Sequence, residues 1–592
     1  MSTSVLGIHN GHNASAAVIE DGILAFALQE ERLSRIKNHG GLPAQALVAC
    51  AGFLGSGDDG NIAAALGGHN LTRCDWRRDD ILRSYGLRSP GVVGRAKRIA
   101  RKNGLISNSV NRIKITGIEE ELRALLAKPQ LRASSFDHHL CHAAAAYFGW
   151  GKMDERVLLL TCDGAGDSVC ATVNVGEGGR IERLASVEES HSIGALYGKV
   201  TYLLGMVPME HEYKLMGLAP YAEKSREAQR IAADFEQIFE FDPHNPMLWR
   251  RTNGCPPLQF AAEYLAERLL RKRFDHVAGG IQLFVERFLV RWVQACVAAT
   301  GIRKLALSGG VFMNVKANQK ILELPEVEEM FVFPSCGDET NAMGAAWLLS
   351  REGRGNIPEP LKHLYLGPEY SESESEAALR GYQFREPVQI REEADVEHAV
   401  ALLLSQGRIV ARFKGRGEFG ARALGNRSIL ANASQPEAVK TINEMIKCRD
   451  FWMPFAPSVL AERSDDYFEK PKPMPAPYMI MTFDTRPEKR AAISAAIHPC
   501  DHTGRPQEVS EDSNADYYRL LKYYEEITGE GLILNTSFNL HGEPVVCTPE
   551  DALRVFDLSG LEHLALGNFL LSKPQPSGYR PASQPAALSH SL

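Results

Sequence analysis

Apolar and polar positions alternate in two N-terminal stretches in the way expected of β-hairpins. Residues 5–22 show an apolar strand, a small polar turn, a second strand and a Glu-Asp-Gly turn. Residues 157–179 repeat that order and end at a Gly-Glu-Gly-Gly turn. Apolar strands that flank such turns gather backbone N–H groups, which suits phosphate or a metal-bound anion. The repetition predicts a duplicated α/β core with a cleft between its halves; two unrelated hairpins are the alternative.

Later segments predict further α/β units and a division into domains. An apolar run at 304–307 is followed by a Gly-Gly corner and a helical pattern. Such a corner lets the backbone approach a nucleotide or substrate because no Cβ stands in the way. Gly, Pro and a Ser/Glu alternation change the composition near 353–376. We therefore expect an N-terminal domain over 1–360, a linker over 361–396, a second α/β domain over 397–572 and a disordered tail over 573–592.

The composition is that of a soluble globular protein with more than one core. The chain has 592 residues, which exceeds the usual size of one domain. Its residues are 44% hydrophobic and 23% charged, as in ordinary globular proteins. A net charge of −7 gives no general attraction to nucleic acid or anionic lipid. No apolar run approaches the roughly 18 residues that span a bilayer, and the chain start has no secretory pattern. The 11 cysteines are scattered and suit reduced thiols, so we expect a cytoplasmic protein.

One stretch stands out because it is basic. Residues 73–114 contain many Arg and Lys and few acids. A solvated helical face is the simpler interpretation. A lid over the cleft, or a contact with an anionic ligand, is the alternative.

The strongest local signal for chemistry is a pair of histidines. His138 and His142 lie four residues apart beside a run of alanines that favours a helix, so both imidazoles project from one face while His139 points elsewhere. Asp163 and Asp338 follow predicted strands and would complete a set of two imidazoles and two carboxylates. Such a set suits iron(II), manganese or zinc better than calcium or magnesium. Without the aspartates, two helix histidines held by hydrogen bonds would be the better interpretation.

Several long blocks, spread in order over nearly the whole chain, match one known pattern. They are Gly11-His-Asn-Ala-Ser-Ala, the His138/His142 pair, Glu212-Tyr-Lys-Leu-Met-Gly-Leu-Ala, Ser308-Gly-Gly-Val-Phe-Met-Asn, Gly337-Asp-Glu-Thr-Asn-Ala-Met-Gly-Ala, Phe419-Gly-Ala-Arg-Ala-Leu-Gly-Asn-Arg-Ser, Lys447 to Pro457, Arg505-Pro-Gln and Asn535-Thr-Ser-Phe-Asn. In these blocks the chain resembles the O-carbamoyltransferases of antibiotic and nodulation-factor biosynthesis, with the architecture of the tobramycin type.

The resemblance implies an α/β protein of two parts. The N-terminal part would have a duplicated actin/ribonuclease-H-like ATPase core, like the tRNA threonylcarbamoyl transferase subunit. The C-terminal part would be an α/β domain like threonylcarbamoyl-adenylate synthase (YrdC-like). In the family, the C-terminal domain makes carbamoyl-adenylate from carbamoyl phosphate and ATP, and the N-terminal domain passes the carbamoyl group to a hydroxyl. The cofactors implied are Fe²⁺ in the N-terminal cleft, with Mn or Zn as alternatives, and Mg²⁺ with ATP.

The two substrates are anions, so their pocket needs fixed cations and hydrogen-bond donors. The matching blocks offer Arg422, Arg427, Lys447, Arg449, Arg505, Ser537 and Asn539 for this role. For any single cation, a structural ion pair is the alternative. In the N-terminal domain we expect nucleotide or carbamoyl contacts at the glycine turns, from Gly164, Gly166, Ser308, Gly309, Gly310 and Asn314.

The transfer step needs a group that accepts the proton of the attacking hydroxyl. His12 is the candidate, because an unperturbed imidazole titrates close to working pH; the alternative is a turn histidine bonded only to backbone. Asn10 would orient the acceptor, and Lys214 would touch phosphate or neutralise Glu212.

The acceptor itself carries no readable signature. A natural-product hydroxyl, on a glycoside or polyol of an antibiotic, is the first expectation, with no nucleic acid or membrane as partner. The alternatives are a tRNA threonylcarbamoylation-type enzyme, a nodulation-factor carbamoyltransferase and a non-catalytic nucleotide-binding protein. The sequence leaves the oligomeric state open, a homodimer being one option.

Overall fold

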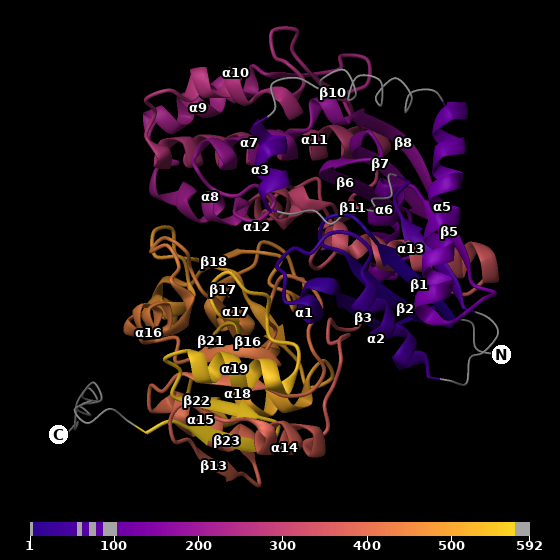
Figure 1. Ribbon diagram of the computed structural model, residues 1–592. Helices are drawn as coiled ribbons and strands as arrows, with labels where there is room; N and C mark the ends of the chain where they lie inside the picture. The colour runs from indigo at the N-terminus through magenta and orange to yellow at the C-terminus, as the bar shows by residue number, and fades with distance from the viewer. Residues whose placement is uncertain (1–3, 56–61, 70–77, 87–103, 575–592) are drawn as a thin grey trace.

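The protein folds into two lobes (Figure 1). The computed structural model describes residues 4–55, 62–69, 78–86 and 104–574. Nearly all of the expected disordered tail, and much of the basic stretch 73–114, lie outside these residues. The described parts of that stretch belong to α3 (Arg78–Gly86) and α5 (Gly104–Leu126).

The first sheet of the N-terminal lobe has the strand order β3-β2-β1-β4-β5. Its strands are β1 (Ser4–His9), β2 (Ser15–Glu20), β3 (Ile23–Gln29), β4 (Ala63–Gly67) and β5 (Arg132–Phe136). β1, β2 and β3 form an antiparallel meander, and β4 and β5 run parallel to β1. Asp21 and Gly22 join β2 to β3 with φ of 49° and 95°, as a tight two-residue hairpin turn requires. The predicted hairpin is confirmed.

The second sheet repeats this topology. Its order is β12-β11-β6-β7-β8, and its strands are β6 (Val157–Gly166), β7 (Val169–Glu177), β8 (Arg180–Glu188), β11 (Lys304–Ser308) and β12 (Glu329–Val332). β6 to β8 form the meander, and β11 and β12 run parallel to β6. The duplication that the sequence repeat predicted is therefore present in the order and direction of the strands.

Two helices lie between the sheets. Each follows the last strand of one half and packs on the sheet of the other half. α6 (His138–Trp150) follows β5 and packs on β6 and β11, and α13 (Asn341–Arg354) follows β12 and packs on β1, β2 and β4. A Cβ on Gly344 would overlap the carbonyl oxygen of Cys141, and one on Gly7 would overlap that of Ala342. These glycines let the two helices and β1 approach closely. The N-terminal end of α6 and the short helix η5 (Asp338–Thr340) therefore meet between the halves.

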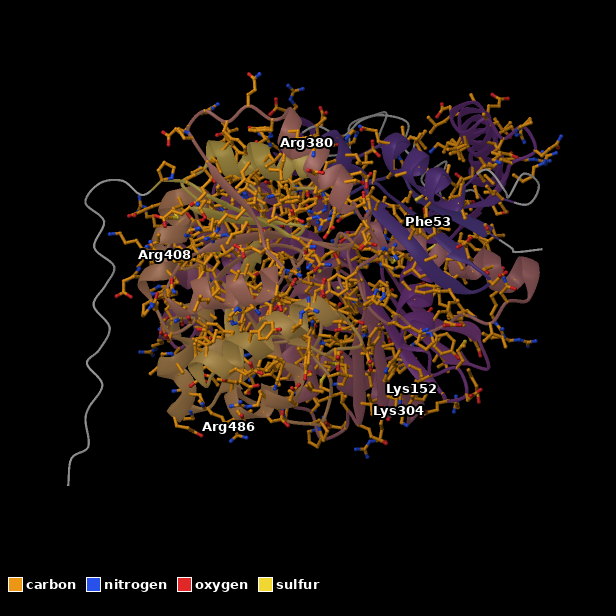
Figure 2. The ribbon with its side chains drawn as sticks, turned by 90° about the horizontal axis from the view of Figure 1, so that it is seen from below. Phe53, Lys152, Lys304, Arg380, Arg408 and Arg486 are labelled. Carbon is orange, nitrogen blue, oxygen red and sulfur yellow. The ribbon has the colours of Figure 1, made fainter. Side chains whose placement is uncertain are left out.

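The remaining helices of the N-terminal lobe cover the two sheets. They are α1 (Glu30–Ser34), α2 (Ala44–Leu54), α7 (Ile193–Leu203), α8 (Glu212–Leu218), α9 (Arg226–Glu236), α10 (Ala262–Leu269), α11 (Phe274–Thr300) and α12 (Val315–Leu322), and a short hairpin joins β9 (Phe239–Phe241) to β10 (Trp249–Arg251). At the surface, Lys152 and Lys304 both bind the Glu329 carboxylate, at 2.6 and 2.9 Å (Figure 2). This ion-pair cluster connects β12, at the edge of the second sheet, to the turn between α6 and β6 that contains Lys152.

The C-terminal lobe, orange and yellow in Figure 1, is built on an eight-stranded sheet of order β13-β23-β22-β14-β15-β21-β16-β20. Its strands are β13 (Gln389–Glu392), β14 (Val410–Phe413), β15 (Arg427–Ala431), β16 (Ala456–Leu460), β20 (Gln507–Val509), β21 (Leu532–Ser537), β22 (His563–Leu566) and β23 (Phe569–Ser572). Its helices are α14 (Glu372–Gly381), α15 (Val396–Ser405), α16 (Glu437–Ile442), α17 (Ser464–Tyr467), α18 (Ala515–Thr528) and α19 (Pro549–Leu558). A smaller sheet contains β17 (Phe468–Glu469), β18 (Phe483–Thr485) and β19 (Thr503–Gly504). The second α/β unit predicted from 397 onward is present.

The segment 361–396, expected to be a linker, is folded. Ser371 and Glu374 form a capping box at the start of α14, with the Glu374 carboxylate accepting from the Ser371 N–H at 2.7 Å. β13 pairs with β23 and extends the large sheet. The Ser/Glu alternation is thus the start of a helix, where Ser and Glu satisfy free backbone N–H groups. The C-terminal lobe begins within the expected linker.

Backbone hydrogen bonds join the two lobes. The Ala27 N–H of β3 donates to the Leu366 carbonyl at 3.0 Å, and the Gly417 N–H donates to the Pro368 carbonyl at 2.9 Å. Residues 364–368 therefore bond to a strand of one lobe and a loop of the other. Within the described ranges, no helix is long and apolar enough to cross a membrane.

Candidate functional site

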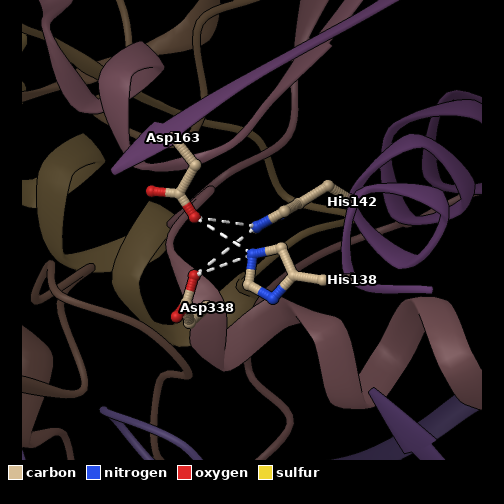
Figure 3. Close-up of side chains that lie close together, drawn as sticks. All are labelled: His138, His142, Asp163 and Asp338. Atoms are coloured by element: carbon tan, nitrogen blue, oxygen red, sulfur yellow. Dashed lines mark hydrogen bonds and ion pairs between the residues drawn. The ribbon is translucent and has the colours of Figure 1, made fainter. Parts of the chain in front are cut away.

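Four predicted residues meet where α6 and η5 come together (Figure 3). Nε2 of His138 lies 3.1 Å from Asp163 Oδ2 and 3.5 Å from Asp338 Oδ1. Nε2 of His142 lies 3.4 and 3.6 Å from the same two oxygens. His138 and His142 come from the first helical turns of α6, Asp163 from β6 and Asp338 from η5. One ligand atom from each residue falls within 4.8 Å of every other, as the sequence predicted.

The geometry fits a bound divalent transition metal. Ligands held about 2.1 Å from a metal lie about 3.0 Å apart in octahedral and about 3.4 Å apart in tetrahedral coordination. The four separations between imidazole nitrogen and carboxylate oxygen, 3.1–3.6 Å, lie close to these values. Two protonated imidazoles and two carboxylates sum to zero charge. One divalent cation with two neutral imidazoles and the same carboxylates gives the same sum, so binding exchanges two protons for the metal.

The electrostatics of the quartet follow from burial and opposite charge. Burial disfavours the His138 imidazolium, but Asp338 and Asp163 outweigh it and raise its pKa to about 9. The pKa of His142 is raised by the same carboxylates against its burial. Although burial opposes it, hydrogen bonds from both histidines hold the pKa of Asp163 well below its usual range. The Asp163 carboxylate is therefore ionised at neutral pH and available as a ligand.

Neighbouring groups orient these four side chains. Ser308 Oγ lies 3.2 Å from His142 Nδ1, and Asn341 Nδ2 lies 3.3 Å from His138 Nδ1. Such outer hydrogen bonds fix the orientation of a ligating imidazole. Asn341 was part of a block noted in the sequence, but nothing there indicated this contact.

The predicted glycine turns form a cradle around Asp163. The Gly164 N–H donates to Asp163 Oδ1 at 2.6 Å. A Cβ on Gly166 would overlap the His138 ring, and one on Gly310 would lie 2.9 Å from Asp163 Oδ1. Gly309 has φ 104°, and a Cβ there would overlap the Cys162 carbonyl. These glycines thus make room for the side chains of His138 and Asp163; nucleotide or carbamoyl contacts by them stay a prediction.

Two predicted residues of this lobe have structural partners. Asn314 caps α12, with Oδ1 accepting from the Ala317 N–H at 3.1 Å, and also bonds to Gln282. Lys214 forms an ion pair with Asp450 of the C-terminal lobe at 3.0 Å, and not with Glu212. His139, expected to point elsewhere, bonds to Thr161 Oγ1 and the Val169 carbonyl.

The turn after β1 places His12 beside the quartet. Its Nε2 is buried and has no hydrogen-bond partner within the described residues. Burial lowers the His12 pKa, although Asp338 and Asp163 act in the opposite direction. The neutral ring can therefore accept a proton. Asn10, at the end of the same strand, is buried.

His9 is a site residue that the sequence did not indicate. Its Nε2 lies 3.0 Å from the His12 carbonyl and 3.9 Å from Asp338 Oδ2. Burial lowers the His9 pKa to about 4, so a neutral ring donates its Nε2–H to that carbonyl. The only sequence signal was its place at the end of β1, directly before the turn.

Three predicted arginines of the C-terminal lobe, Arg422, Arg449 and Arg505, lie close enough for their charges to repel one another. Burial lowers the pKa of Arg422 to about 10, and Arg449 adds repulsion. Burial and the charges of Arg422 and Arg449 move the pKa of Arg505 well below its usual range. None of the three has an ion pair or a hydrogen bond to any residue that the structure describes. Desolvated like charges that repel one another and form no ion pair are features of an anion-binding site.

Lys447, Ser537 and Asn539 form a second cluster beside this one. Lys447 Nζ donates to Ser537 Oγ at 3.1 Å and to Asn539 Oδ1 at 2.6 Å. Burial, with repulsion from Arg449 and Lys37, moves the Lys447 pKa well below its usual range. The structure thus brings three predicted residues together, and among the residues that it describes no carboxylate takes part in the contacts of Lys447.

Arg427 differs from the other predicted cations. Its guanidinium donates four hydrogen bonds, to the carbonyls of Lys414, Asn426, Pro368 and Gly415. It also lies 3.7 Å from the centre of the Phe413 ring. Four donor contacts of Arg427 thus go to the backbone and hold the β14–β15 corner together, and its contact with an anion stays a prediction.

Comparison with protein families decides the assignment. Residues 4–347 match the carbamoyltransferase N-terminus model, and residues 401–573 match the carbamoyltransferase C-terminus model. The chain belongs to the carbamoyltransferase family. The resemblance expected from the sequence blocks is confirmed.

Relatives of this carbamoyltransferase family member occur in distant organisms. An uncharacterized protein of Synechocystis is 31% identical over 622 aligned residues, covering 96% of this chain and 97% of the relative. Nodulation protein NolNO of Sinorhizobium fredii is 32% identical over 566, covering 95% of this chain and 79% of the relative. Among solved structures, full-length HypF in its phosphate- and nucleotide-bound form matches at TM-score 0.32, with 13% identity over 60% of this chain and 56% of that one. A similarity of that size supports no conclusion here.

Proposed function

We propose that the protein is an ATP-dependent O-carbamoyltransferase. Carbamoyl phosphate, ATP and one water would give carbamoyl-adenylate, pyrophosphate and phosphate in the C-terminal lobe. An acceptor hydroxyl would then attack the carbamoyl carbon, and AMP would leave. The products are a carbamate ester, AMP, pyrophosphate and phosphate, so the atoms balance.

The observation that carries the proposal is the arginine cluster of Arg422, Arg449 and Arg505. Both substrates are multiply charged anions, and three buried guanidinium groups that form no ion pair among the described residues match them. Lys447 lies close enough to Arg449 for the two charges to repel. Bound phosphate groups would relieve the repulsion and recover the desolvation cost of these cations.

The metal quartet supports the transfer step in the N-terminal lobe. His138, His142, Asp163 and Asp338 would hold iron(II), with manganese or zinc as alternatives, and the ion would supply Lewis-acid stabilisation of the developing carbamoyl oxyanion. His12 would accept the proton of the attacking hydroxyl at its free Nε2. His9 would hold the His12 backbone in place through the carbonyl.

The acceptor is proposed as a hydroxylated small molecule, such as a glycosidic or polyol natural product. Some relatives bear the name nodulation protein, which would favour an oligosaccharide acceptor. Equally similar relatives are uncharacterized proteins of Synechocystis and Methanocaldococcus jannaschii, so the comparisons favour no single acceptor.

The two half-reactions can be tested separately. Wild-type protein should release pyrophosphate from ATP only when carbamoyl phosphate is added. Replacing His138 and His142 by Ala should abolish carbamoyl transfer to a hydroxylated acceptor, detected as a mass gain, while pyrophosphate release persists within about threefold. Release of ADP instead of AMP, or loss of both activities in a folded variant, would contradict the proposal.

A further inference from the structure

The loop that carries Asp338 is bonded directly to the loop that carries Arg422. Ser335 Oγ donates to Glu339 Oε1 at 2.5 Å and accepts from the Ala421 N–H at 3.1 Å. A hydroxyl has one hydrogen and two lone pairs, so this one side chain can make both bonds at once. Ser335 thereby links the residue after Asp338 to the residue before Arg422.

Glu339 anchors this link inside the N-terminal lobe. Its side chain is buried, and the Ser15 hydroxyl of β2 donates to its carbonyl at 2.7 Å. Glu339 also directly follows Asp338 in η5. A movement of Ser335 would therefore be transmitted to Asp338 through at most one hydrogen bond and one peptide unit.

The other side of the link is equally constrained. The Gly420 N–H donates to Gln29 Oε1 at 3.1 Å, and Arg32 donates to the Gly420 carbonyl at 2.5 Å. Gly420 has φ 97°, and a Cβ there would lie 2.5 Å from the Ser335 Cβ. Ser335 itself has φ 55°, which is uncommon for a residue other than glycine. The loop at Ser335 and the loop at 420–422 are therefore in van der Waals contact and joined by a hydrogen bond, so a shift of one would displace the other.

We propose that Ser335 and Glu339 are positioning residues that hold the anion-binding arginines and the metal-binding loop at one fixed separation. Binding of an anion by Arg422 would order the backbone of 420–422, and Ser335 would transmit this order to residues 337–339. The inference rests on the proposed function, because it assigns the arginines to an anionic substrate. It adds that an anion bound at Arg422 would order the loop that carries Asp338.

Amide hydrogen exchange on the metal-free protein tests the link without any activity measurement. Sulfate serves as the probe, because it is a dianion that needs neither ATP nor turnover. In wild type, saturating sulfate should slow exchange at least fivefold both in a peptide spanning 415–427 and in one spanning 335–341. In S335A the protection of 415–427 should remain, and that of 335–341 should fall below twofold.

A second variant reaches the same contact from the other lobe. G420A introduces the Cβ that meets Ser335 and should uncouple the loops as S335A does, and the double variant should lose no more than either single one. S371A is the matched control: it removes a hydroxyl from the exposed capping box of α14 and should behave as wild type. Kinetically, S335A should lower the kcat of carbamoyl transfer at least tenfold while pyrophosphate release stays within twofold.

The outcomes separate this inference from the proposed function. Equal protection of 335–341 in wild type and S335A would overturn the positioning role, as would protection confined to 415–427 in wild type. If sulfate protects neither segment in wild type, the arginine cluster does not bind anions, and the proposed function fails together with the link.

Discussion

Replacing Arg422 by Met should stabilise the ligand-free protein, although it removes a residue of the proposed site. Burial and repulsion lower the Arg422 pKa from 12.5 to about 10. At about 1.4 kcal/mol per pKa unit, the charged form costs the folded state up to about 3 kcal/mol at neutral pH. Arg422 keeps some solvent contact, so we expect about 1–3 kcal/mol to be recovered. Methionine retains the length of the side chain without the charge.

The matched comparison is Arg427→Met in the same loop region. Arg427 donates to four backbone carbonyls and stacks on Phe413, so its removal leaves buried acceptors unpaired. We expect this variant to lose about 3 kcal/mol or more. The two substitutions are chemically identical, and the structure predicts opposite signs for them.

Differential scanning calorimetry measures the comparison. For a unit the size of the C-terminal lobe, 1 kcal/mol shifts the melting temperature by about 2–4 °C. Arg422→Met should raise the melting temperature of this lobe by about 2–12 °C without ligand, and should reduce the additional rise caused by sulfate or ATP. A fall of more than about 2 °C in the ligand-free variant would refute the reasoning, because it would mean that the Arg422 charge is compensated in the fold.

Three further predictions test the core and the metal centre. Burial lowers the pKa of Lys199 to about 8, so below that pH the folded state pays the full cost of the charge. Between about pH 8 and 10.5 the unfolded chain binds more protons than the folded protein, so the free energy of unfolding of the wild type should rise by about 2–3 kcal/mol relative to Lys199→Met. Urea unfolding at several pH values measures this rise. A difference in unfolding free energy between the two proteins that stays constant with pH would contradict the prediction. Gly344→Ala should cost about 3 kcal/mol or more, because its Cβ would overlap the Cys141 carbonyl where α6 and α13 cross, and an unchanged melting temperature would exclude that close packing. His138→Ala should lower the iron bound after reconstitution from about one equivalent to almost none, as metal analysis would show, whereas retained iron would place the ligands elsewhere.

The repeated sheets could be predicted because their signals are local. Alternating apolar residues and Gly/Asp/Asn turns report strands and hairpins within a window of some twenty residues. His138 and His142 were identified for the same reason, since four-residue spacing on a helix fixes a common face. The boundary of the C-terminal lobe was misplaced, because the Ser371–Glu374 capping box has the composition of a linker.

Contacts between distant segments had no such signal. Arg422 and Arg427 lie five positions apart in one block. Only the folded structure shows that Arg427 bonds to four carbonyls, whereas Arg422 forms no ion pair within the described part of the chain. The hydrogen bond between Ser335 and Ala421 joins residues 86 positions apart. His9 was missed because a lone histidine at a strand end is indistinguishable from a core residue until the neighbouring turn is placed.

The way residues 364–368 bond to both lobes bears on how the chain could be recombined with its relatives. A chimera that joins the N-terminal lobe of one relative to the C-terminal lobe of another would bring together a β3 strand and a 417–419 loop that never evolved side by side. The bridging segment would then match only one of them. Crossover points are best placed at the start of α14, and residues 417–422 are best inherited with the N-terminal partner, so that the seam between lobes is transplanted as a unit.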